Sequence, residues 1–379
     1  MNFKTLFRGV TVAVGISLAT PSLVHAKDPI PVVATFSILG DLVKQIGGKH
    51  ISLTTLVGPD GDAHVYKPTP ADARAVSGAK VLFLNGLEFE GWINRLVDAS
   101  DFKGLRVVST KGIEAIPFGE DGHDDHKDAK HAKHDDHKDH GHAKHDDHKD
   151  DKHDNHKDRG HAKHDDHKDD KHDDHKDHGH AKHDDHKDDK HAKHDDHAGH
   201  DHGAFDPHAW QSAENIVIYL DNITAALAKA DPSNASNFFK NRGAYVAKVK
   251  ALDAEISAKM KALPEAARTV ITSHDAFGYF AKRYGLNFEA PQGMSAESEA
   301  SAKDVAKLIT QIRKEKIRAV FVETITDNRL MEQIVRETGA KIGGTLYSDA
   351  LSGPQGPAAS YLDMMRHNSS TILGALAGS

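Results

Sequence analysis

The sequence predicts an α/β protein with two lobes, each a mostly parallel sheet flanked by helices, joined by one long connecting helix. Short apolar runs alternate with segments of helical periodicity in both halves of the 379-residue chain, a pattern typical of βαβ units and parallel sheets. Residues 233–263 contain one Gly and no Pro, which is long enough for a helix that spans a domain. A low-complexity segment interrupts the first lobe, and we predict it to be a disordered insert.

The elements of the first half follow from apolar spacing and turn residues. An apolar run at 31–36 suits a buried strand, and Ser37 begins a segment whose apolar residues recur at helical spacing. Residues 51–57 form the next apolar run, which ends at the turn cluster GPDG. We expect further strands at 80–84 and 105–109, and helices at 69–76, 88–97 and 209–229.

The second half repeats this alternation after Pro264. We expect strands at 269–272 and 319–322 and one that ends at 346, with helices at 276–284, 302–315, 328–338 and 359–376. Two open α/β lobes bind ligands where the carboxyl ends of their strands face each other. The predicted domains are a signal peptide at 1–26, an N-terminal lobe at 27–230, a connecting helix at 231–264 and a C-terminal lobe at 265–379.

Residues 121–203 form an insert in the N-terminal lobe that is rich in His, Asp and Lys. It holds 25 of the 31 His together with 27 Asp, 16 Lys and one Arg, and a 19-residue unit recurs at 142–160 and 161–179. Without apolar residues the insert cannot offset the entropy of ordering, so we predict a disordered loop. Its composition is typical of a metal-collecting tract, and a solubilising spacer is the alternative.

The net charge excludes one class of function. The insert carries −10 and the whole chain −8, so the remaining residues are close to neutral. A basic nucleic-acid-binding domain is therefore excluded, and we expect no nucleic-acid partner. All 14 Phe, 7 Tyr and 2 Trp lie outside the insert, so that part of the chain can bury substantial cores. The chain has no Cys, hence no disulfide.

Residues 1–26 have the order of a cleavable secretory signal peptide. Lys4 and Arg8 precede an apolar run at 10–18, and a small-residue end follows at Ala26. A membrane anchor is the alternative, but this run is too short to span a bilayer. No Cys follows the run to carry a lipid, and no second stretch of about 18 apolar residues exists. We therefore predict a protein of the periplasm.

Three histidines outside the insert and one aspartate occupy comparable loops. His64 follows the turn cluster, and His208 precedes a predicted helix. His274 and Asp349 each follow a predicted strand. Singly, each is more often an ordinary surface or capping residue, but four such positions favour a joint site at the cleft. Of the remaining histidines outside the insert, one belongs to the signal peptide and two are expected at the surface: His25, His50 and His367.

These loops carry motifs that resemble those of the ZnuA/TroA-like metal-binding receptors of bacterial ABC transporters, over essentially the whole mature chain. The motifs are HxYxPxPxD at 64–72, DPHxW at 206–210, SHDAFGYFAKRYG at 273–285 and YSDALS at 347–352. The resemblance implies two α/β lobes bridged by a long helix, with a metal in the cleft. By position it implies four ligands, namely His64, His208, His274 and Asp349. A His-rich insert before the second His is typical of the zinc-importing branch, although some relatives brace the second lobe with a Cys pair that this chain lacks.

The ligand set implied by this resemblance favours zinc. Three imidazoles and one carboxylate suit four-coordinate Zn²⁺, whereas Mn²⁺ prefers more oxygen, and Cu²⁺, Ni²⁺ or Co²⁺ would also bind. The manganese-binding branch carries Glu at the position of His274, so this residue discriminates the two. Four protein ligands leave no open position for an activated water, and no catalytic motif is present. We therefore expect no enzyme, no catalytic residue and no resident cofactor.

The leading hypothesis is a monomeric receptor that captures periplasmic Zn²⁺ and delivers it to an inner-membrane ABC permease with a cytoplasmic ATPase. The alternative is a zinc-storage or buffering protein that acts mainly through the His-rich tract. A Mn²⁺ receptor and a metallo-hydrolase are less favoured. Deletion of residues 121–203 separates the first two hypotheses, because tight one-site binding survives only in a receptor.

Overall fold

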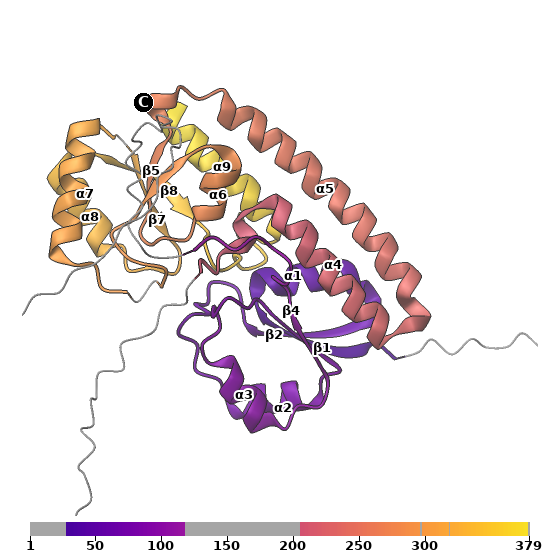
Figure 1. Cartoon of the computed structure of the whole chain (residues 1–379). Coiled ribbons are helices and arrows are strands. Elements are labelled where there is room, and N and C mark those ends of the chain that lie inside the picture. Colours follow the sequence, from indigo (N-terminus) through magenta and orange to yellow (C-terminus); the bar gives the residue numbers. More distant parts are fainter. Residues whose placement is uncertain (1–27, 118–204, 296–297, 318, 378–379) are drawn as a thin grey trace, which may run out of the picture. The chain divides into compact units, whose positions relative to one another are not determined.

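The computed structural model of the chain describes residues 28–117, 205–295, 298–317 and 319–377, which belong to one compact unit. Two four-stranded parallel sheets organise these residues, and a long helix connects them (Figure 1). The predicted α/β fold, with two such sheets, flanking helices and one long connecting helix, is confirmed. The predicted signal peptide at 1–26 and the insert at 121–203 lie outside the described residues, and the predicted limits of the two lobes stay predictions.

The first sheet has the spatial order β2-β1-β3-β4. The chain moves from β1 to β2 and then crosses to the other side of β1, so the loops of this sheet diverge at a switch point beside β1, where open α/β sheets bind ligands. Helix α1 lies on one face of the sheet, and α2 and α3 lie on the other. The strands are β1 (Ile30–Phe36), β2 (Ile51–Val57), β3 (Val81–Leu84) and β4 (Leu105–Val108), and the helices are α1 (Ser37–Gly47), α2 (Pro70–Gly78) and α3 (Ile93–Ser100).

Helix α3 begins five residues later than the sequence predicts. The segment before it is a tight turn in which Leu87 and Glu88 both have a positive φ, of 53° and 61°. The buried carboxylate of Glu90 holds this turn, because it accepts hydrogen bonds from the backbone N–H groups of Asn85, at 2.7 Å, and Gly86, at 3.2 Å. The spacing of apolar residues does not reveal this turn, because a hydrogen-bonded carboxylate stabilises it.

The second sheet has the order β6-β5-β7-β8, which is the same topology as the first. Its strand β6 was not predicted, since three half-exposed residues give no apolar run. The strands are β5 (Thr269–Ile271), β6 (Asn287–Glu289), β7 (Ala319–Glu323) and β8 (Lys341–Leu346), and the helices are α6 (Gly278–Tyr284), α7 (Ala302–Glu315), α8 (Arg329–Thr338) and α9 (Tyr361–Ala377).

Alternate residues of the second sheet enter two separate cores. Val270 and Phe321 belong to the main core, which also contains the apolar residues of the first sheet. Ile271, Val320 and Val322 face the opposite way and pack with α7 and α8 in a smaller core. This follows from the two-residue period of a strand, whose successive side chains point to opposite faces. Strands buried on both faces explain the short continuous apolar runs in the sequence.

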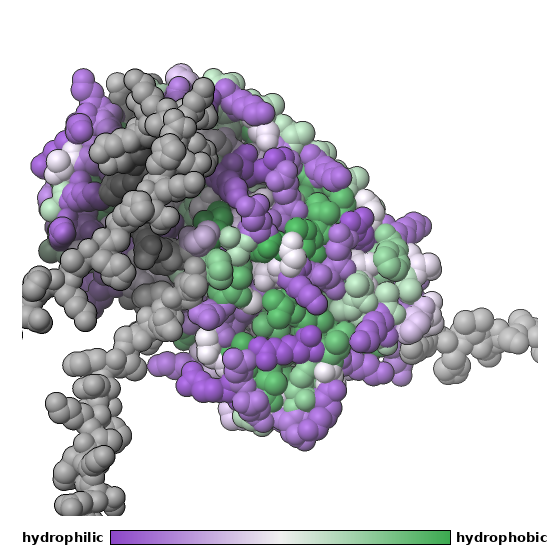
Figure 2. All heavy atoms as spheres, viewed as in Figure 1, coloured by the Kyte–Doolittle hydropathy of each residue, from purple (hydrophilic) through white to green (hydrophobic). Residues whose placement is uncertain are grey.

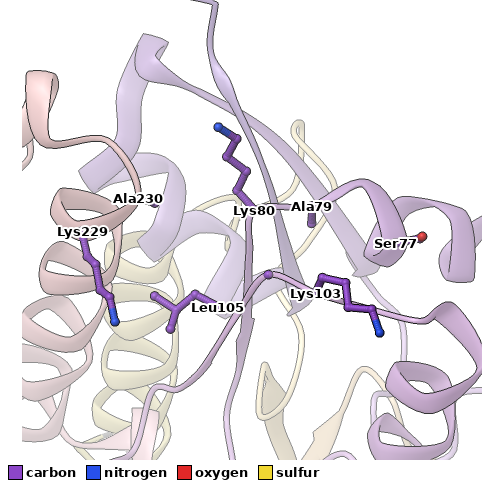
Figure 3. A pocket seen from close by; sticks show the side chains of 8 residues that line it. Ser77, Ala79, Lys80, Lys103, Leu105, Lys229 and Ala230 are labelled. Atoms are coloured by element: carbon purple, nitrogen blue, oxygen red, sulfur yellow. The ribbon is translucent and has the colours of Figure 1, made fainter.

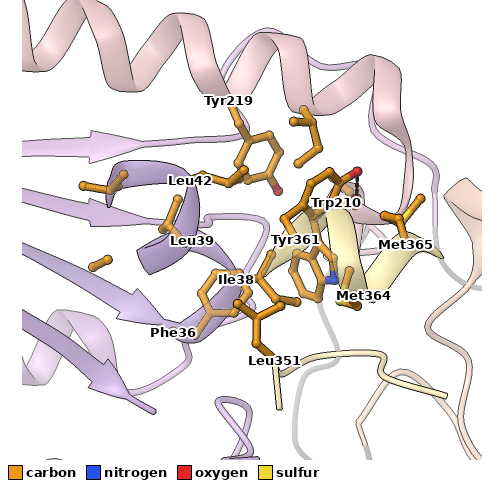
Figure 4. Close-up of a cluster of buried hydrophobic side chains, with 14 of the residues drawn as sticks. Phe36, Ile38, Leu39, Leu42, Trp210, Tyr219, Leu351, Tyr361, Met364 and Met365 are labelled. Carbon is orange, nitrogen blue, oxygen red and sulfur yellow. Dashed lines mark hydrogen bonds between the residues drawn. The ribbon is translucent and has the colours of Figure 1, made fainter. Parts of the chain in front are cut away.

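Two long helices lie side by side, and the second of them connects the two halves of the fold (Figure 1). Helix α4 (Ala213–Ala230) packs along α5 (Ala235–Lys261), and α5 also contacts α1, α6 and α9. Beneath them, Phe36 and Leu39 from the first sheet and α1 meet Trp210, Tyr361 and Met365 in one buried cluster (Figure 4). Fully burying each such apolar side chain contributes about 1.5–3 kcal/mol. This cluster therefore fastens the start of α9 to the first half of the chain.

The coloured part of the surface in view is mixed in polarity. Figure 2 shows hydrophilic side chains interspersed with small apolar patches on the face in view. Among the described residues, no helix combines the length and the apolar character that crossing a membrane requires.

Candidate metal centre

The structure brings together the four residues that the sequence singles out. His64 lies in the loop after β2, His208 lies just before a short 3₁₀ helix, and His274 and Asp349 follow β5 and β8. One ligand atom from each of the four lies within 4.8 Å of the others. Among the described residues, no second group of three or more His, Asp or Glu side chains gathers in this way. The other two described histidines, His50 and His367, lie outside the cluster, as expected.

The three imidazoles present their Nε2 atoms to the Asp349 carboxylate. His64 Nε2 and His274 Nε2 are each 3.3 Å from Asp349 Oδ2, and His208 Nε2 is 3.5 Å from Oδ1. The Nε2 atoms of His64 and His208 are 3.3 Å apart. A regular tetrahedron whose centre is about 2.0–2.1 Å from its corners has edges of about 3.3–3.4 Å. The three contacts of 3.3 Å therefore have the spacing of donors around one four-coordinate cation, and the contact of 3.5 Å is slightly longer.

The centre is buried, and its carboxylate lacks hydrogen bonds of standard geometry. The side chains of His208, His274 and Asp349 are fully buried, and that of His64 is 9% exposed. Neither oxygen of Asp349 receives a hydrogen bond of standard geometry from the described residues. Leaving a buried carboxylate unpaired is costly, so buried charges in proteins are paired or coordinate metals. The donor set therefore fits a divalent cation.

Two further carboxylates orient the buried imidazoles. Asp206 Oδ1 is 2.8 Å from His208 Nδ1 and also accepts the backbone N–H of His208 at 2.9 Å. Glu323 Oε2 is 2.7 Å from His274 Nδ1, and its Oε1 accepts the backbone N–H groups of Ser273 and His274 at 2.9 Å each. A carboxylate at Nδ1 fixes the tautomer that presents Nε2 to a metal and raises the basicity of the ring.

Sequence reasoning missed the role of Glu323. Asp206 belongs to a motif that the sequence analysis quotes, whereas Glu323 belongs to none. Its signal was an acidic residue directly after the apolar run at 319–322, in a strand that is buried at every position. A carboxylate there requires a partner, because Glu is almost never fully buried alone.

Hydrogen bonds and aromatic packing hold the loop that bears His64. The loop that bears His64 turns where Asp62 Oδ1 accepts the backbone N–H of His64 at 2.8 Å. Trp92 Nε1 donates to the carbonyl of Ala63 at 2.7 Å, and the ring of Phe89 meets the His64 ring edge to face at 4.6 Å between centroids. These contacts hold the one partly exposed imidazole of the centre.

The charges of the centre shift the pKa values of its members. Burial lowers the pKa of His274, but the adjacent Glu323 and Asp349 outweigh it and hold that pKa well above the ordinary value of 6.5. The pKa of His208 is also raised, since Asp349 and Asp206 outweigh its burial. Burial raises the pKa of Asp349, yet His208 and His274 hold it well below 3.8. The metal-free centre thus favours an ionised Asp349 and the protonated forms of His208 and His274.

We expect metal binding to release protons. A cation needs neutral imidazoles, and the raised pKa values of His208 and His274 favour the protonated rings in the metal-free protein. Binding should therefore release protons at neutral pH, chiefly from His274, and affinity should fall as pH drops, beginning above 6.5. Calorimetry of zinc binding in buffers of different ionisation enthalpy measures the number of protons released. Proton release near zero at pH 7 contradicts the assignment.

Replacing Glu323 with Gln should weaken metal binding. The neutral amide has no charge to raise the basicity of His274, and if its oxygen keeps the backbone N–H groups of Ser273 and His274, its NH2 group faces Nδ1. Loss of such a partner typically costs about 10–100-fold in metal affinity. The number of protons released should also fall, because the charge of Glu323 is the largest influence that raises the His274 pKa. Glu289→Gln, at the end of β6, is the matched control and should bind as the unaltered protein does. Equal behaviour of the two variants speaks against an orienting role.

A cavity away from the metal centre has a basic lining, but its charged groups do not converge on a common point. The cavity, of about 450 Å³, lies at the amino ends of β3 and β4, and Lys80, Lys103 and Lys229 line it. The three ammonium groups point away from one another (Figure 3), and Lys103 is paired with Asp101 at 2.5 Å. It lies at the opposite ends of the strands from the loops that bear the metal centre.

The fold and the centre define a class: an α/β protein that binds a divalent metal ion with buried imidazoles and one carboxylate. The model of one family, the periplasmic zinc-uptake complex component A, matches residues 32–375. The chain belongs to this family of metal-binding solute receptors of ABC transporters. It is therefore an extracytoplasmic receptor and not an enzyme, as the sequence predicts.

The curated relatives are named for binding different metals. The chain is 27% identical to the iron-binding protein YfeA of Yersinia pestis over 341 residues, which cover 90% of this chain and 84% of the relative. It is 27% identical to the manganese-binding lipoprotein MntA of Bacillus subtilis over 356 residues, 93% and 91% of the two chains. The family therefore fixes a metal receptor but not the metal.

Solved structures share the fold. The periplasmic zinc-binding protein TroA of Treponema pallidum superimposes with a TM-score of 0.66 at 24% identity, covering 92% of this chain and 99% of the other. A manganese-bound variant of a periplasmic metal-binding protein from Candidatus Liberibacter asiaticus gives 0.65 at 25% identity, covering 91% and 98%.

Proposed function

We propose that this protein is a zinc receptor of the periplasm, with His64, His208, His274 and Asp349 as the four ligands. It captures Zn²⁺ as a monomer and delivers it to an inner-membrane ABC permease with a cytoplasmic ATPase. The observation that carries the proposal is the donor set, three Nε2 atoms and one carboxylate with contacts of 3.3–3.5 Å. The three contacts of 3.3 Å match the edges of a zinc tetrahedron with bonds of about 2.0–2.1 Å, and the fourth, from His208 to Asp349, is slightly longer.

The surroundings of the donors favour zinc over manganese. Mn²⁺ prefers carboxylate, carbonyl and water oxygens, and the described centre offers one carboxylate in a buried setting. The carboxylates of Asp206 and Glu323 are directed to Nδ1 atoms at 2.8 and 2.7 Å, so they serve the imidazoles. Copper binds such a set more tightly than zinc, and selection between these two then depends on which ion is available.

Competitive titration tests the metal. We expect purified protein to bind one Zn²⁺ tightly at the centre and to prefer it to Mn²⁺ and Fe²⁺ by several orders of magnitude, with Co²⁺ giving the absorption spectrum of a tetrahedral site. A preference for Mn²⁺ or Fe²⁺, or an octahedral Co²⁺ spectrum, contradicts the zinc assignment while leaving the family unchanged.

The insert supports a second candidate function, zinc storage. Its 25 His and 27 Asp would offer many weak sites. The chain on either side of it is paired: Pro117 and Phe205 form an antiparallel bridge, and the Asp206 N–H donates to the Ile116 carbonyl at 2.8 Å. The described residues that flank the insert are therefore joined to each other, and Phe205 lies three positions before His208. A collecting tract anchored there would raise the local concentration of zinc beside the centre.

Deletion of residues 121–203 separates receptor from store. Because Pro117 and Phe205 are already paired, the four residues left between them can close as a short loop. We expect the shortened protein to keep one tight site of unchanged affinity and to lose the weak sites. Its association rate at low salt should fall, because 27 Asp no longer attract the dication. Disappearance of tight binding would instead favour storage in the insert.

A further inference from the structure

A metal ion cannot leave this centre unless a ligand moves. His208, His274 and Asp349 are fully buried, and all four donor atoms lie within 4.8 Å of one another. A receptor that hands over its metal must therefore break the set. The attachment of each ligand to the rest of the fold decides which one moves most readily.

Asp349 follows the last strand of the second sheet, yet its loop is bonded to the first half of the chain. The carbonyl of Ser348, the neighbouring residue, accepts two hydrogen bonds of 2.8 Å, from Trp210 Nε1 and Gln211 Nε2. Two residues after Asp349, the N–H of Leu351 donates to Ser37 Oγ at 2.9 Å. The carbonyl of Leu351 accepts the N–H of Asp60 at 2.9 Å.

The chain beyond this loop continues the same attachment. The N–H of Tyr361, the first residue of α9, donates to Asp41 Oδ2 at 2.9 Å, and the Tyr361 hydroxyl donates to the carbonyl of Trp210 at 3.2 Å. Leu351 and Tyr361 are buried in the cluster shared with β1 and α1 (Figure 4). The segment from Ser348 to the start of α9 therefore packs as part of the first half.

His274 is attached differently. Its backbone N–H and its Nδ1 atom both face the Glu323 carboxylate of β7, and its carbonyl accepts the Thr272 hydroxyl at 3.1 Å. It also forms a bridge with Gln292. All these partners belong to the second sheet and its loops. The nearest bond to the first half is made by Tyr279 in α6, whose hydroxyl donates to the Asp206 carbonyl at 3.0 Å.

We propose that Trp210 and Gln211 are positioning residues that hold the Asp349 loop to the first half of the chain, so that three ligands share one body and His274 is the single ligand on the other. The proposal rests on the proposed metal receptor. Their two N–H groups converge on one carbonyl, directly before the ligand, which fixes the direction of the carboxylate. The metal is then exposed when the second sheet carries His274 away, while His64, His208 and Asp349 stay together.

A double-mutant cycle tests the positioning role. Gln211→Met keeps the volume of the side chain and removes its donor, and it should weaken Zn²⁺ binding by about 10-fold or more, as loss of a supporting residue does. In a background of Asp349→Asn the same change should alter affinity less than about two-fold, because Gln211 acts through Asp349. Gln333→Met is the control, since Gln333 is exposed on α8 and donates to Glu337 at 2.9 Å, away from the centre and from the Asp349 loop. It should bind zinc as the unaltered protein does.

Two outcomes of the cycle overturn the proposal: an unchanged affinity in Gln211→Met, or an equal loss in both backgrounds. Trp210→Phe, which keeps a ring and removes the other donor to Ser348, repeats the test if Gln211→Met does not fold. Failure of the zinc proposal is seen separately, in the titration of the unaltered protein, and the cycle is then run with the ion that this titration selects.

The three-to-one division is tested by distances between spin labels, since the chain contains no Cys of its own. One pair joins exposed Ser77 on α2 to exposed Gln355 in the segment after Asp349, and the other joins Ser77 to exposed Lys314 on α7. On removal of zinc with a chelator, we expect the first distance to stay constant and the second to change. A change of similar size in both pairs, or in neither, overturns the division.

Discussion

Asn in place of Asp349 is expected to remove tight zinc binding from the centre, with a loss of about 10²–10⁴-fold in affinity. Asp349 is the one carboxylate whose oxygens lie 3.3–3.5 Å from all three Nε2 atoms. It is also fully buried, and its pKa is held well below 3.8 by His208 and His274 despite the opposing effect of burial. Removing one partner of a buried charged set costs about 3–5 kcal/mol, which corresponds to this range of dissociation constants.

The measurement is competition with a chromophoric zinc chelator, in protein that lacks residues 121–203 so that binding by the insert does not interfere. Asp327→Asn is the control, because Asp327 is exposed and pairs with Arg329. Thermal unfolding gives a second readout. Zinc at 1,000 times its dissociation constant adds about 4 kcal/mol to the stability of a protein that binds only when folded. If Asp349→Asn keeps both the affinity and this stabilisation, Asp349 is not a ligand.

Glu in place of His274 is expected to shift the centre away from zinc and toward manganese. A hard oxygen then replaces a borderline nitrogen, which favours Mn²⁺ relative to Zn²⁺. The structure adds a complication, because the new carboxylate would lie beside Glu323, whose Oε2 is now 2.7 Å from His274 Nδ1. Two buried carboxylates at this distance cannot both ionise, so one retains a proton. His274→Glu alone should therefore bind every metal weakly.

The double variant His274→Glu/Glu323→Gln relieves this repulsion and is the sharper test. We expect it to recover affinity relative to His274→Glu, with a zinc-to-manganese preference reduced by at least about 10-fold from that of the unaltered protein. Competitive titration with both ions measures the ratio, and Glu289→Gln again serves as the control for loss of an acidic strand end. An unchanged preference in both variants means that His274 does not select the metal.

Local patterns accounted for much of the fold. The strand at 51–57 and the helix at 302–315 have the predicted limits, because apolar spacing and a Ser cap at Ser301 act within a few residues. Helix α3 and strand β6 were misjudged. The first begins late because Glu90 holds a strained turn, and the second is three residues long and gains its stability from pairing with β5. Both depend on partners that periodicity does not reveal.

The sequence by itself determined the α/β class, the long helix and the four residues that meet at the centre, since strand ends and turn motifs place polar side chains on loops at one edge of a sheet. Tertiary structure alone decided how those residues are held. Glu323 and Gln211 lie in no recognisable pattern, yet one orients His274 and the other binds the carbonyl beside Asp349, across 49 and 137 positions of sequence. Only folding brings such distant partners within hydrogen-bonding distance, because these contacts form between loops that share no local periodicity.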